Sequence, residues 1–448
     1  MAPPGFVVDV PELGAAPVAD IQAFRAYRYD LGRAGTLGDL TAPPYDVIDP
    51  DLQDALYRRS PHNVIRLILN KETPADTEAN SRYTRSAQDL RDWQREGIIV
   101  QDSARSLYVY HQDFEAEGKR FTRRGFLARV RLERFGEGRI YPHEHTMSGP
   151  KEDRFKLMRA TGMNLSPVFG LYPDIDSAIQ EKLDEAVRRS LPLEATDHLG
   201  VVSRLWPVTD QSVVSAVTGL MGPKPTFIAD GHHRYETALR YLEDRRQAGE
   251  VSGPDAPPNF VLMMLVSMQD PGLVILPTHR LVSGVGDLTS ERLRSSLGSH
   301  FEVENVGSGE KGAHDAWELV QAHHGQDILG FGTVADGQWH IARFLSPSLM
   351  EELAAEHSRA WHSLAVSILH VAVLGKLLPA GQCRYVHLLR EVTEAVAANQ
   401  CQLAVLVPPA EMSHVEEIAG NLEKMPAKST YFYPKLLSGL VFHSLKAT

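Results

Sequence analysis

A strand that turns sharply into a helix near residue 230 constrains the fold more than any other feature of the chain. The apolar run at 225–229 predicts a short strand, and residues 232–249 carry apolar side chains at helical spacing. The chain must therefore turn at Asp230 and Gly231, and a glycine permits the backbone conformation that such a turn requires. A strand, a tight turn and a helix in direct succession are typical of proteins that mix α and β structure.

Helices and strands are predicted to alternate over the rest of the chain. The length of 448 residues is too great for one ordinary core, and the Gly- and Ser-containing run at 283–286 marks a plausible boundary. We therefore expect a mixed α/β protein with a first region at 1–285 and a second α/β region at 286–448. Helices are expected at 77–96, 151–160, 174–190, 210–220, 232–249, 290–298, 311–323, 363–378 and 411–423, and strands at 106–110, 125–132, 168–172, 225–229, 260–266, 272–276, 337–344 and 402–407.

Charge and composition exclude several classes of protein. A net charge of −11 argues against a general nucleic-acid binder, whose affinity rests on basic side chains. Cys383 and Cys401 form neither a disulfide framework nor a zinc ribbon, which favours a reducing compartment. The first residues lack a signal-peptide pattern, and no stretch approaches the ~20 apolar residues that span a bilayer. We expect a cytoplasmic protein without membrane or nucleic-acid partners, and an oligomer is compatible with the sequence.

The turn itself carries the polar sequence Asp230-Gly231-His232-His233-Arg234. The first turn of a helix offers unpaired N–H groups and a partial positive charge, and His232, His233 and Arg234 add hydrogen-bond donors. This combination predicts a site for phosphate. Asp230 is expected to hold Mg²⁺ or to orient an acceptor hydroxyl; the alternative is that Asp230 caps the helix and the histidines lie on the surface.

A second polar cluster lies at 141–154, between a strand and a helix. Glu144, flanked by His143 and His145, is expected to act as a general base, because a carboxylate in a closing site can be tuned for proton transfer. Lys151 and Arg154 lie one helical turn apart and are expected to meet a phosphate or a substrate carboxylate. The alternative is a solvated loop followed by a capped helix start.

Two further segments are candidates for contact with the site. Thr278, His279 and Arg280 follow an apolar strand and are expected to contact substrate at the same sheet edge, unless they only complete the strand end. The segment 428–435 mixes hydroxyls, aromatic rings and lysines. We expect it either to close over the site or, as we favour, to pack between the two regions.

A transition-metal hydrolase is a competing interpretation of the histidines. His143, His145, His232 and His233 could together form a site for zinc, manganese or iron, although their spacing is not that of a metalloprotease. The phosphate-binding character of the segment from Asp230 to Arg234 favours Mg²⁺ with a nucleotide instead.

Several blocks of this sequence, in one order, resemble the bacterial and archaeal domain-of-unknown-function 1015 family. The resemblance runs over nearly the whole chain. The blocks are Thr41-Ala-Pro-Pro-Tyr-Asp46, the segment 143–154, Ala229-Asp-Gly-His-His-Arg234, Pro277-Thr-His-Arg280 and Pro426-Ala-Lys-Ser-Thr-Tyr-Phe-Tyr-Pro-Lys435.

The block from Asp230 to Arg234 is also similar to the phosphate motif of the ParB/sulfiredoxin-like superfamily, which includes free serine kinases, and Pro142-His143-Glu144 looks like the loop that carries their proposed base. The resemblance implies a ParB/sulfiredoxin-like catalytic core in the first region. It further implies that Glu144 activates a serine hydroxyl, that Asp230 assists it or the metal, and that the residues from Gly231 to Arg234 hold the donor phosphates.

The expected activity is phosphoryl transfer from ATP, ADP or pyrophosphate, with Mg²⁺, to the hydroxyl of free L-serine or a similar small amino acid, which gives O-phosphoserine. The chain is longer than the small free serine kinases and has no Walker sequence, so the donor stays open. The alternatives are a phosphatase or metal-dependent hydrolase acting on a small phosphorylated metabolite, and a non-catalytic nucleotide-binding regulator of the ParB kind.

Overall fold

The hairpin of β4 (Leu107–Ala116) and β5 (Lys119–Arg131) forms the centre of the larger sheet in this computed structural model, which describes residues 20–77, 79–144, 146 and 148–446. The two strands, which overlap those predicted at 106–110 and 125–132, pair antiparallel, with Tyr108 opposite Leu127. Further strands extend the sheet on both sides of the hairpin. Their order is β6 (Ile140–Tyr141), β11 (Thr226–Asp230), β8 (Val168–Tyr172), β12 (Phe260–Ser267), β5, β4, β10 (Val202–Val208) and β9 (Leu193–Thr196), and β1 (Ile21–Gln22) pairs with β5.

Strand β12 shows why this sheet has so apolar a sequence at its centre. Side chains alternate between the two faces of a strand, and both faces of β12 are covered. Leu262 and Met264 belong to the core on one face, while Val261 and Met263 belong to the core on the other. One face packs against α9 (His232–Gln247), α7 (Ala178–Val187) and α8 (Gln211–Met221), and the other against α3 (Pro50–Arg59), α4 (Ile65–Ile68) and α5 (Arg82–Arg95).

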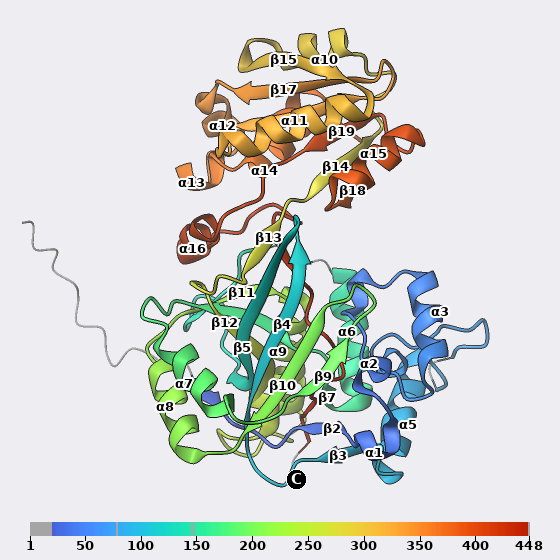
Figure 1. Cartoon of the computed structure of the whole chain (residues 1–448), viewed down its shortest axis with the longest axis vertical. Helices are drawn as coiled ribbons and strands as arrows, with labels where there is room; N and C mark the ends of the chain where they lie inside the picture. Colours follow the sequence, from blue (N-terminus) through green and yellow to red (C-terminus); the bar gives the residue numbers. More distant parts are fainter. Residues whose placement is uncertain (1–19, 78, 145, 147, 447–448) are drawn as a thin grey trace, which may run out of the picture.

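A second sheet forms the upper lobe in Figure 1. Its strand order is β15 (Phe301–Ser308), β17 (Gln338–Phe344), β16 (Ile328–Thr333), β19 (Leu403–Leu406), β14 (His279–Ser283) and β18 (Gln382–Val386). Helices α11 (Gly309–His323) and α15 (Leu389–Ala397) cover one face, while α10 (Ser290–Leu297), α12 (Pro347–Leu353), α16 (Met412–Gly420) and a π-helix (Ile368–Leu377) contribute to the core on the other. The mixed α/β fold is therefore confirmed in both lobes.

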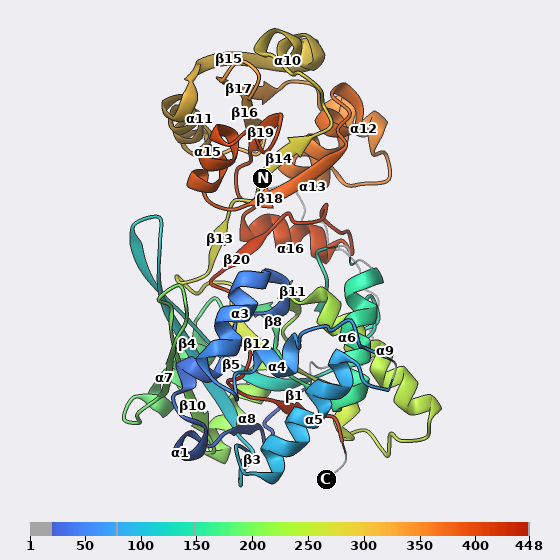
Figure 2. The same cartoon turned by 90° about the vertical axis from the view of Figure 1, so that its right-hand side faces the viewer.

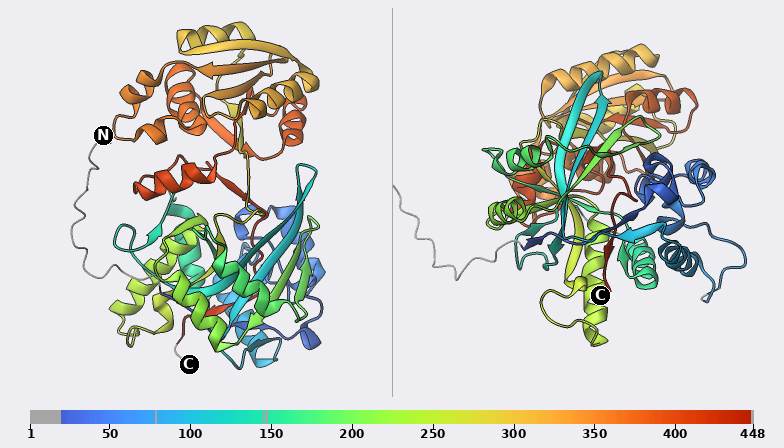
Figure 3. Two further views of the ribbon diagram at one scale, coloured as in Figure 1. Left: turned by 60° about the vertical axis from the view of Figure 1, so that its left-hand side comes forward. Right: turned by 60° about the horizontal axis from the view of Figure 1, so that its bottom comes forward.

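The two lobes meet at a narrow waist, where the chain crosses from one to the other and later returns (Figures 2 and 3). The outgoing strand β13 (Val274–Leu276) pairs antiparallel with the returning strand β20 (Tyr431–Tyr433). The last described strand, β21 (His443–Ser444), pairs antiparallel with β7 (Met163–Asn164) in the first lobe. We call residues 20–277 with 426–446 the first lobe and residues 278–425 the second.

Two details differ from what the sequence pattern predicts. The apolar run at 272–276 is typical of a strand buried on both faces of a sheet, but it forms the half-buried strand β13, which pairs with the returning C-terminal segment and not with the larger sheet. The two sheets also do not follow a single division of the chain at residue 285. Strand β14, which precedes this residue, pairs within the second sheet, and β21, near the end of the chain, pairs within the first lobe. No helix among the described residues is long and apolar enough to cross a membrane.

Candidate active site

The turn between β11 and α9 has the geometry that its sequence predicts. Gly231 adopts φ 89°, in the left-handed region that glycine favours, and stands at the N-cap of α9. A Cβ at this position would lie 2.9 Å from the guanidinium of Arg234. Because a glycine has no side chain to cap the helix, the first N–H groups of α9 point to the space in front of the turn, where an anion is favoured.

Asp230 is held between two cations at the start of this turn. Lys435 Nζ lies 2.9 Å from its Oδ1, and Arg234 Nη2 donates to its Oδ2 at 2.5 Å. Burial by itself raises the pKa of Asp230, but Lys435 and Arg234 outweigh it and hold that pKa well below its ordinary range. Asp230 is therefore ionised, and it orients Arg234 and Lys435 and does not cap the helix.

Two histidines form a buried layer behind the turn. His143 is fully buried, with Nδ1 2.7 Å from the carbonyl oxygen of Ile228 and Nε2 2.8 Å from the hydroxyl of Thr430. Since a carbonyl only accepts, Nδ1 carries the proton and Nε2 accepts from Thr430. His232 accepts a hydrogen bond from the backbone N–H of His143 at 3.2 Å. Burial lowers the pKa of His143 to about 4 and that of His232 well below its ordinary value, so both rings are neutral.

Glu144 follows His143 and faces the same space as the start of α9. Its Oε1 accepts a hydrogen bond of 3.2 Å from the backbone N–H of Ser429. Burial raises the pKa of Glu144 most strongly, Asp230 adds to the rise, and Lys428 and Lys435 oppose it, so that the pKa of Glu144 is about 7. A carboxylate that titrates near neutral pH is suited to taking a proton from a hydroxyl.

These groups surround one pocket of about 140 Å³. It is smaller than the roughly 300–1,000 Å³ typical of sites for drug-sized ligands, so it suits a small molecule or one part of a larger one. His233 lines it beside the turn, and burial together with Lys428 lowers the pKa of His233. The lining residues come from both lobes and are Tyr45, Asp46, Glu144, Asp230, Gly231, His232, His233, Arg234, Tyr385, Ala427 and Lys428.

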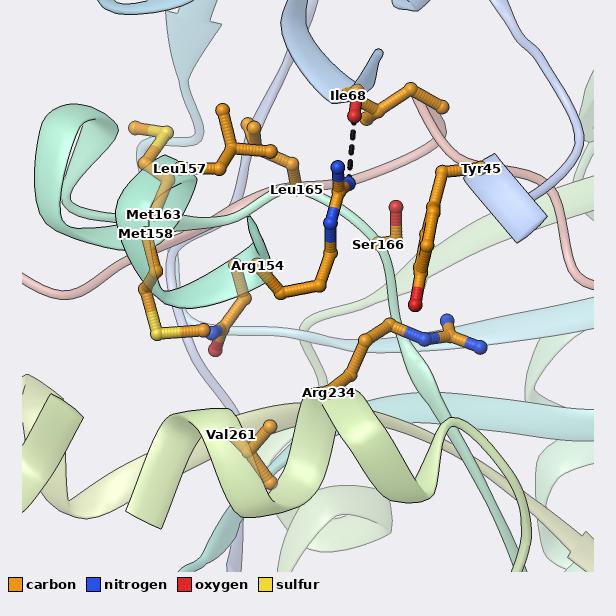
Figure 4. A pocket seen from close by; sticks show the side chains of 11 residues that line it. Tyr45, Ile68, Arg154, Leu157, Met158, Met163, Leu165, Ser166, Arg234 and Val261 are labelled. Atoms are coloured by element: carbon orange, nitrogen blue, oxygen red, sulfur yellow. Dashed lines mark hydrogen bonds between the residues drawn. The ribbon is translucent and has the colours of Figure 1, made fainter. Parts of the chain in front are cut away.

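A narrower cavity of about 40 Å³ adjoins this pocket and shares Tyr45 and Arg234 with it (Figure 4). Arg154 lies over the Tyr45 ring, with its guanidinium carbon 3.9 Å from the ring centroid, and it donates to the carbonyl of Ile68 at 2.7 Å. The structure thus places Arg154 behind Tyr45, outside the lining of the main pocket.

The other predicted residues of the 143–154 cluster lie apart from the pocket or cannot be placed. Lys151 binds Glu236 of α9, with Nζ 2.8 Å from a carboxylate oxygen, and so ties α6 (Ser148–Thr161) to α9. His145 lies outside the described residues. Lys151 and its partner Glu236 do not line the pocket.

The predicted group at 278–280 lies at the start of the second sheet. Thr278 Oγ1 is 3.4 Å from the ring of His387, and His279 is buried, with its Nδ1 accepting from the backbone N–H of Val407 at 3.3 Å. Arg280 is also buried and donates to the carbonyl oxygen of Lys428 at 3.0 Å. None of these three residues lines the described pocket, but Arg280 holds a segment that does.

The site does not fit a metal ion held directly by Asp230. Both of its carboxylate oxygens already bind cationic side chains. Among the described residues, no group of three or more His, Cys, Asp or Glu side chains is arranged to hold a metal ion. The rings of His143 and His232 do pack edge to face, 4.8 Å between centroids, and His232 accepts a hydrogen bond from the backbone N–H of His143.

Five side chains at the site were not predicted individually from the sequence. They are Tyr45, Asp46, Tyr385, Lys428 and Lys435. Four of them fall in segments whose polar or aromatic composition stood out, 41–46 and 428–435, but nothing local assigns them to the pocket. Tyr385 carries no local signal, because it reaches the pocket only through the packing of the second lobe.

The family model described as "Protein of unknown function (DUF1015)" matches residues 21–367. The chain belongs to the DUF1015 family. This confirms the family that the sequence blocks predicted, and no curated protein matches the chain. Because the family description names no activity, the chemistry of this DUF1015 protein has to be inferred from the pocket itself.

Three solved structures that are similar to the DUF1015 chain are distant from it in sequence. A free serine kinase mutant in complex with AMP is 11% identical, with a TM-score of 0.34 over 66% of this chain and 84% of that chain. A conserved hypothetical protein from Pyrococcus furiosus is 13% identical, with a TM-score of 0.32 over 66% and 87%. SbnI from Staphylococcus aureus, with a C-terminal truncation, is 11% identical, with a TM-score of 0.32 over 70% and 86%.

Proposed function

We propose that this DUF1015 protein transfers a phosphoryl group from ATP, ADP or pyrophosphate to the side-chain hydroxyl of free L-serine or a similar small amino acid. The product would be O-phosphoserine. One observation carries the proposal: Glu144, with a pKa of about 7, faces the same small pocket as the uncapped start of α9. A base and an anion site in one pocket are the two parts that phosphoryl transfer to a hydroxyl requires.

The anion half of the proposed site is the start of α9 with the cations around it. The helix N-terminus offers N–H groups and a partial positive charge to the donor phosphates. Lys428 and His233 line the pocket and are placed to meet phosphate oxygens or the carboxylate of the amino acid. Arg234 is fixed by Asp230, so its charge is preorganised to stabilise the negative charge that develops during transfer.

The base half of the proposed site is Glu144. In its ionised form it would accept the proton of the serine hydroxyl as the oxygen attacks the donor phosphorus, and the bond from phosphorus to the donor oxygen would break. A base works best when its pKa lies near the working pH, because it is then both available and strong enough. The resemblance of Pro142-His143-Glu144 to the loop of the free serine kinases favours serine as the acceptor.

Mg²⁺ belongs to this proposal only as a partner of the donor phosphates. Asp230 binds Arg234 and Lys435 and does not fit as a metal ligand, so no step is assigned to a metal held by the protein. Of the other residues predicted to bind substrate, Arg154 and Arg280 contact the lining residues Tyr45 and Lys428, whereas Lys151 binds Glu236 outside the lining.

The test is to incubate the protein and Mg²⁺ with ATP, ADP, CTP or pyrophosphate and pooled amino acids, and to measure phosphorylated products by mass. We expect O-phosphoserine with the wild type and its loss in Glu144→Gln. Glu152→Gln is the matched control, because Glu152 is exposed and binds Arg240 on the surface. Absence of a phosphorylated amino acid with every donor, or full activity of Glu144→Gln, would overturn the proposal. Phosphate release from O-phosphoserine without a donor would identify a hydrolase instead.

A further inference from the structure

The returning segment 428–435, which we call the strap, supplies contacts to both halves of the pocket. At one end Lys428 lines the pocket, and the backbone N–H of Ser429 donates to Glu144 at 3.2 Å. At the other end Lys435 binds Asp230 at 2.9 Å. The position of the strap therefore determines the surroundings of the proposed base and of the carboxylate that orients Arg234.

Two fully buried arginines hold the two ends of the strap. Arg280, on β14 of the second lobe, is 1% exposed and donates to the carbonyl oxygen of Lys428 at 3.0 Å. Arg123, on β5 of the first lobe, is 0% exposed and donates to the carbonyl oxygens of Pro434 at 2.6 Å and Tyr433 at 3.3 Å. Each lobe thus contributes one guanidinium to the same short segment.

Neither guanidinium has a carboxylate among its hydrogen-bond partners in the described residues. Besides the strap, Arg280 donates to the carbonyl of Thr278 and, at 3.4 Å, to the ring of His370, and Arg123 donates to the side chain of Gln112. Burial lowers the pKa of each arginine to about 10. A buried charge without an opposite charge lowers the stability of the fold. A contribution to stability therefore does not explain why two such arginines are buried here.

We infer that Arg123 and Arg280 are positioning residues that fix the strap from the two lobes and thereby set the geometry of Glu144, Asp230 and the lysines around the pocket. The assignment to catalysis rests on the proposed function, whereas the positioning of Glu144 can be tested without it. The fork of an arginine holds two acceptors at fixed angles, which the single ammonium of a lysine cannot do. Replacing either arginine with lysine therefore keeps the charge and loosens the strap.

The first measurement is the titration of Glu144 itself, by the infrared carboxyl band that is present in the wild type and absent in Glu144→Gln. In Arg280→Lys we expect the midpoint to rise by about 0.7 pH unit, because a loosened strap weakens the bond from Ser429 and moves Lys428 away. The charged and titratable groups that also face this region, and that stay unchanged in the variant, are Asp46, Asp230, His232, His233, Arg234 and Lys435.

The second measurement is the pH dependence of the rate of phosphoryl transfer. We expect its acid limb to shift upward with the infrared midpoint in Arg280→Lys, and Arg123→Lys to lower kcat through Lys435 and Asp230. Arg129→Lys is the matched control, because Arg129 lies on the same strand as Arg123, is 8% exposed and binds the side chain of Gln22 away from the pocket. It should leave both the midpoint and the rate profile unchanged.

An unchanged Glu144 midpoint in Arg280→Lys, together with an unchanged kcat in Arg123→Lys, would overturn the inference. If the wild type makes no phosphorylated product, the proposed function fails, while the infrared titration of Arg280→Lys still decides whether the strap positions Glu144. Should the two lysine variants not fold, hydrogen exchange in the wild type replaces them. The backbone amides of the strap should then be protected from exchange with solvent. Exchange as fast as in the exposed loop at 197–200 would show that the arginines do not fix the strap.

Discussion

At the scale of single residues, the pocket shows two carboxylates whose surroundings drive their pKa values apart. Asp230 binds two cations and stays ionised, whereas burial brings Glu144 to a pKa of about 7. Such a pair assigns different tasks to two chemically similar groups: the first orients positive charge, and the second exchanges a proton. The sequence predicted both residues from their motifs, but no local pattern pairs Asp230 with Lys435, which lies 205 positions away.

The pH dependence of the rate tests the role of Glu144. Because the base must be ionised to accept a proton, we expect kcat to fall as the pH drops through about 7, the pKa of Glu144. Glu144→Gln should lower kcat by about 100- to 10,000-fold and remove this dependence. Steady-state kinetics across neutral pH measure both effects, and a rate independent of pH across neutrality would contradict this role.

At the scale of elements, the junction of β11 and α9 was predictable because every signal for it is local. An apolar run, a glycine and a helical period occur within a few residues. The position of β13 was not predictable from the sequence. Its apolar residues are equally compatible with a core strand and with a ribbon covered by a distant segment. For the strap the sequence left two alternatives open, closing over the site and packing between the regions, because the partners of its polar groups lie on elements far away in the sequence.

Gly231→Ala tests whether the geometry of this junction matters to the site. A residue with a Cβ loses about 1–2 kcal/mol in the left-handed conformation, and here the new atom also displaces the guanidinium of Arg234. We expect this displacement to lower kcat by about 100-fold, since a shift of about 1 Å at a reacting site has such effects.

The matched control for this junction is Gly249→Ala, just beyond the other end of α9. Gly249 has φ 71°, and a Cβ added there would meet no other atom within 4 Å, so the substitution adds strain without touching the pocket. Denaturant unfolding and kinetics of both variants separate strain from function. Equal loss of activity in the two would show that Arg234 needs no particular position.

At the scale of the whole molecule, the chain leaves the first lobe at the waist and later returns to it. The returning residues complete the first core: Phe432, Leu437 and Phe442 are buried in the same cluster as Phe169 and Leu262. No local pattern predicts this return, because periodicity gives the type of an element and not its partner. The pocket consequently includes Tyr385 and Lys428, which a fold of the first 285 residues alone would lack.

Leu437→Ala tests whether the returning segment is part of the first core. Leu437 is 2% exposed, and its truncation should lower the free energy of unfolding by about 2–5 kcal/mol. Leu191→Ala is the control, because Leu191 is 95% exposed and should change that free energy by less than about 0.5 kcal/mol. Denaturant unfolding measures both, and similar small effects would show that the segment adds little to the core.

If the pocket transfers a phosphoryl group to the hydroxyl of serine, the oxygen of that hydroxyl must remain in the product. Its fate is therefore the decisive measurement. The wild-type protein is given Mg²⁺, each phosphoryl donor in turn, and L-serine labelled with ¹⁸O in its side chain. We expect O-phosphoserine that retains the label, formed by the wild type and not by Glu144→Gln. O-phosphoserine without the label would rule out this transfer. So would inorganic phosphate as the sole product, with its new oxygen taken from water.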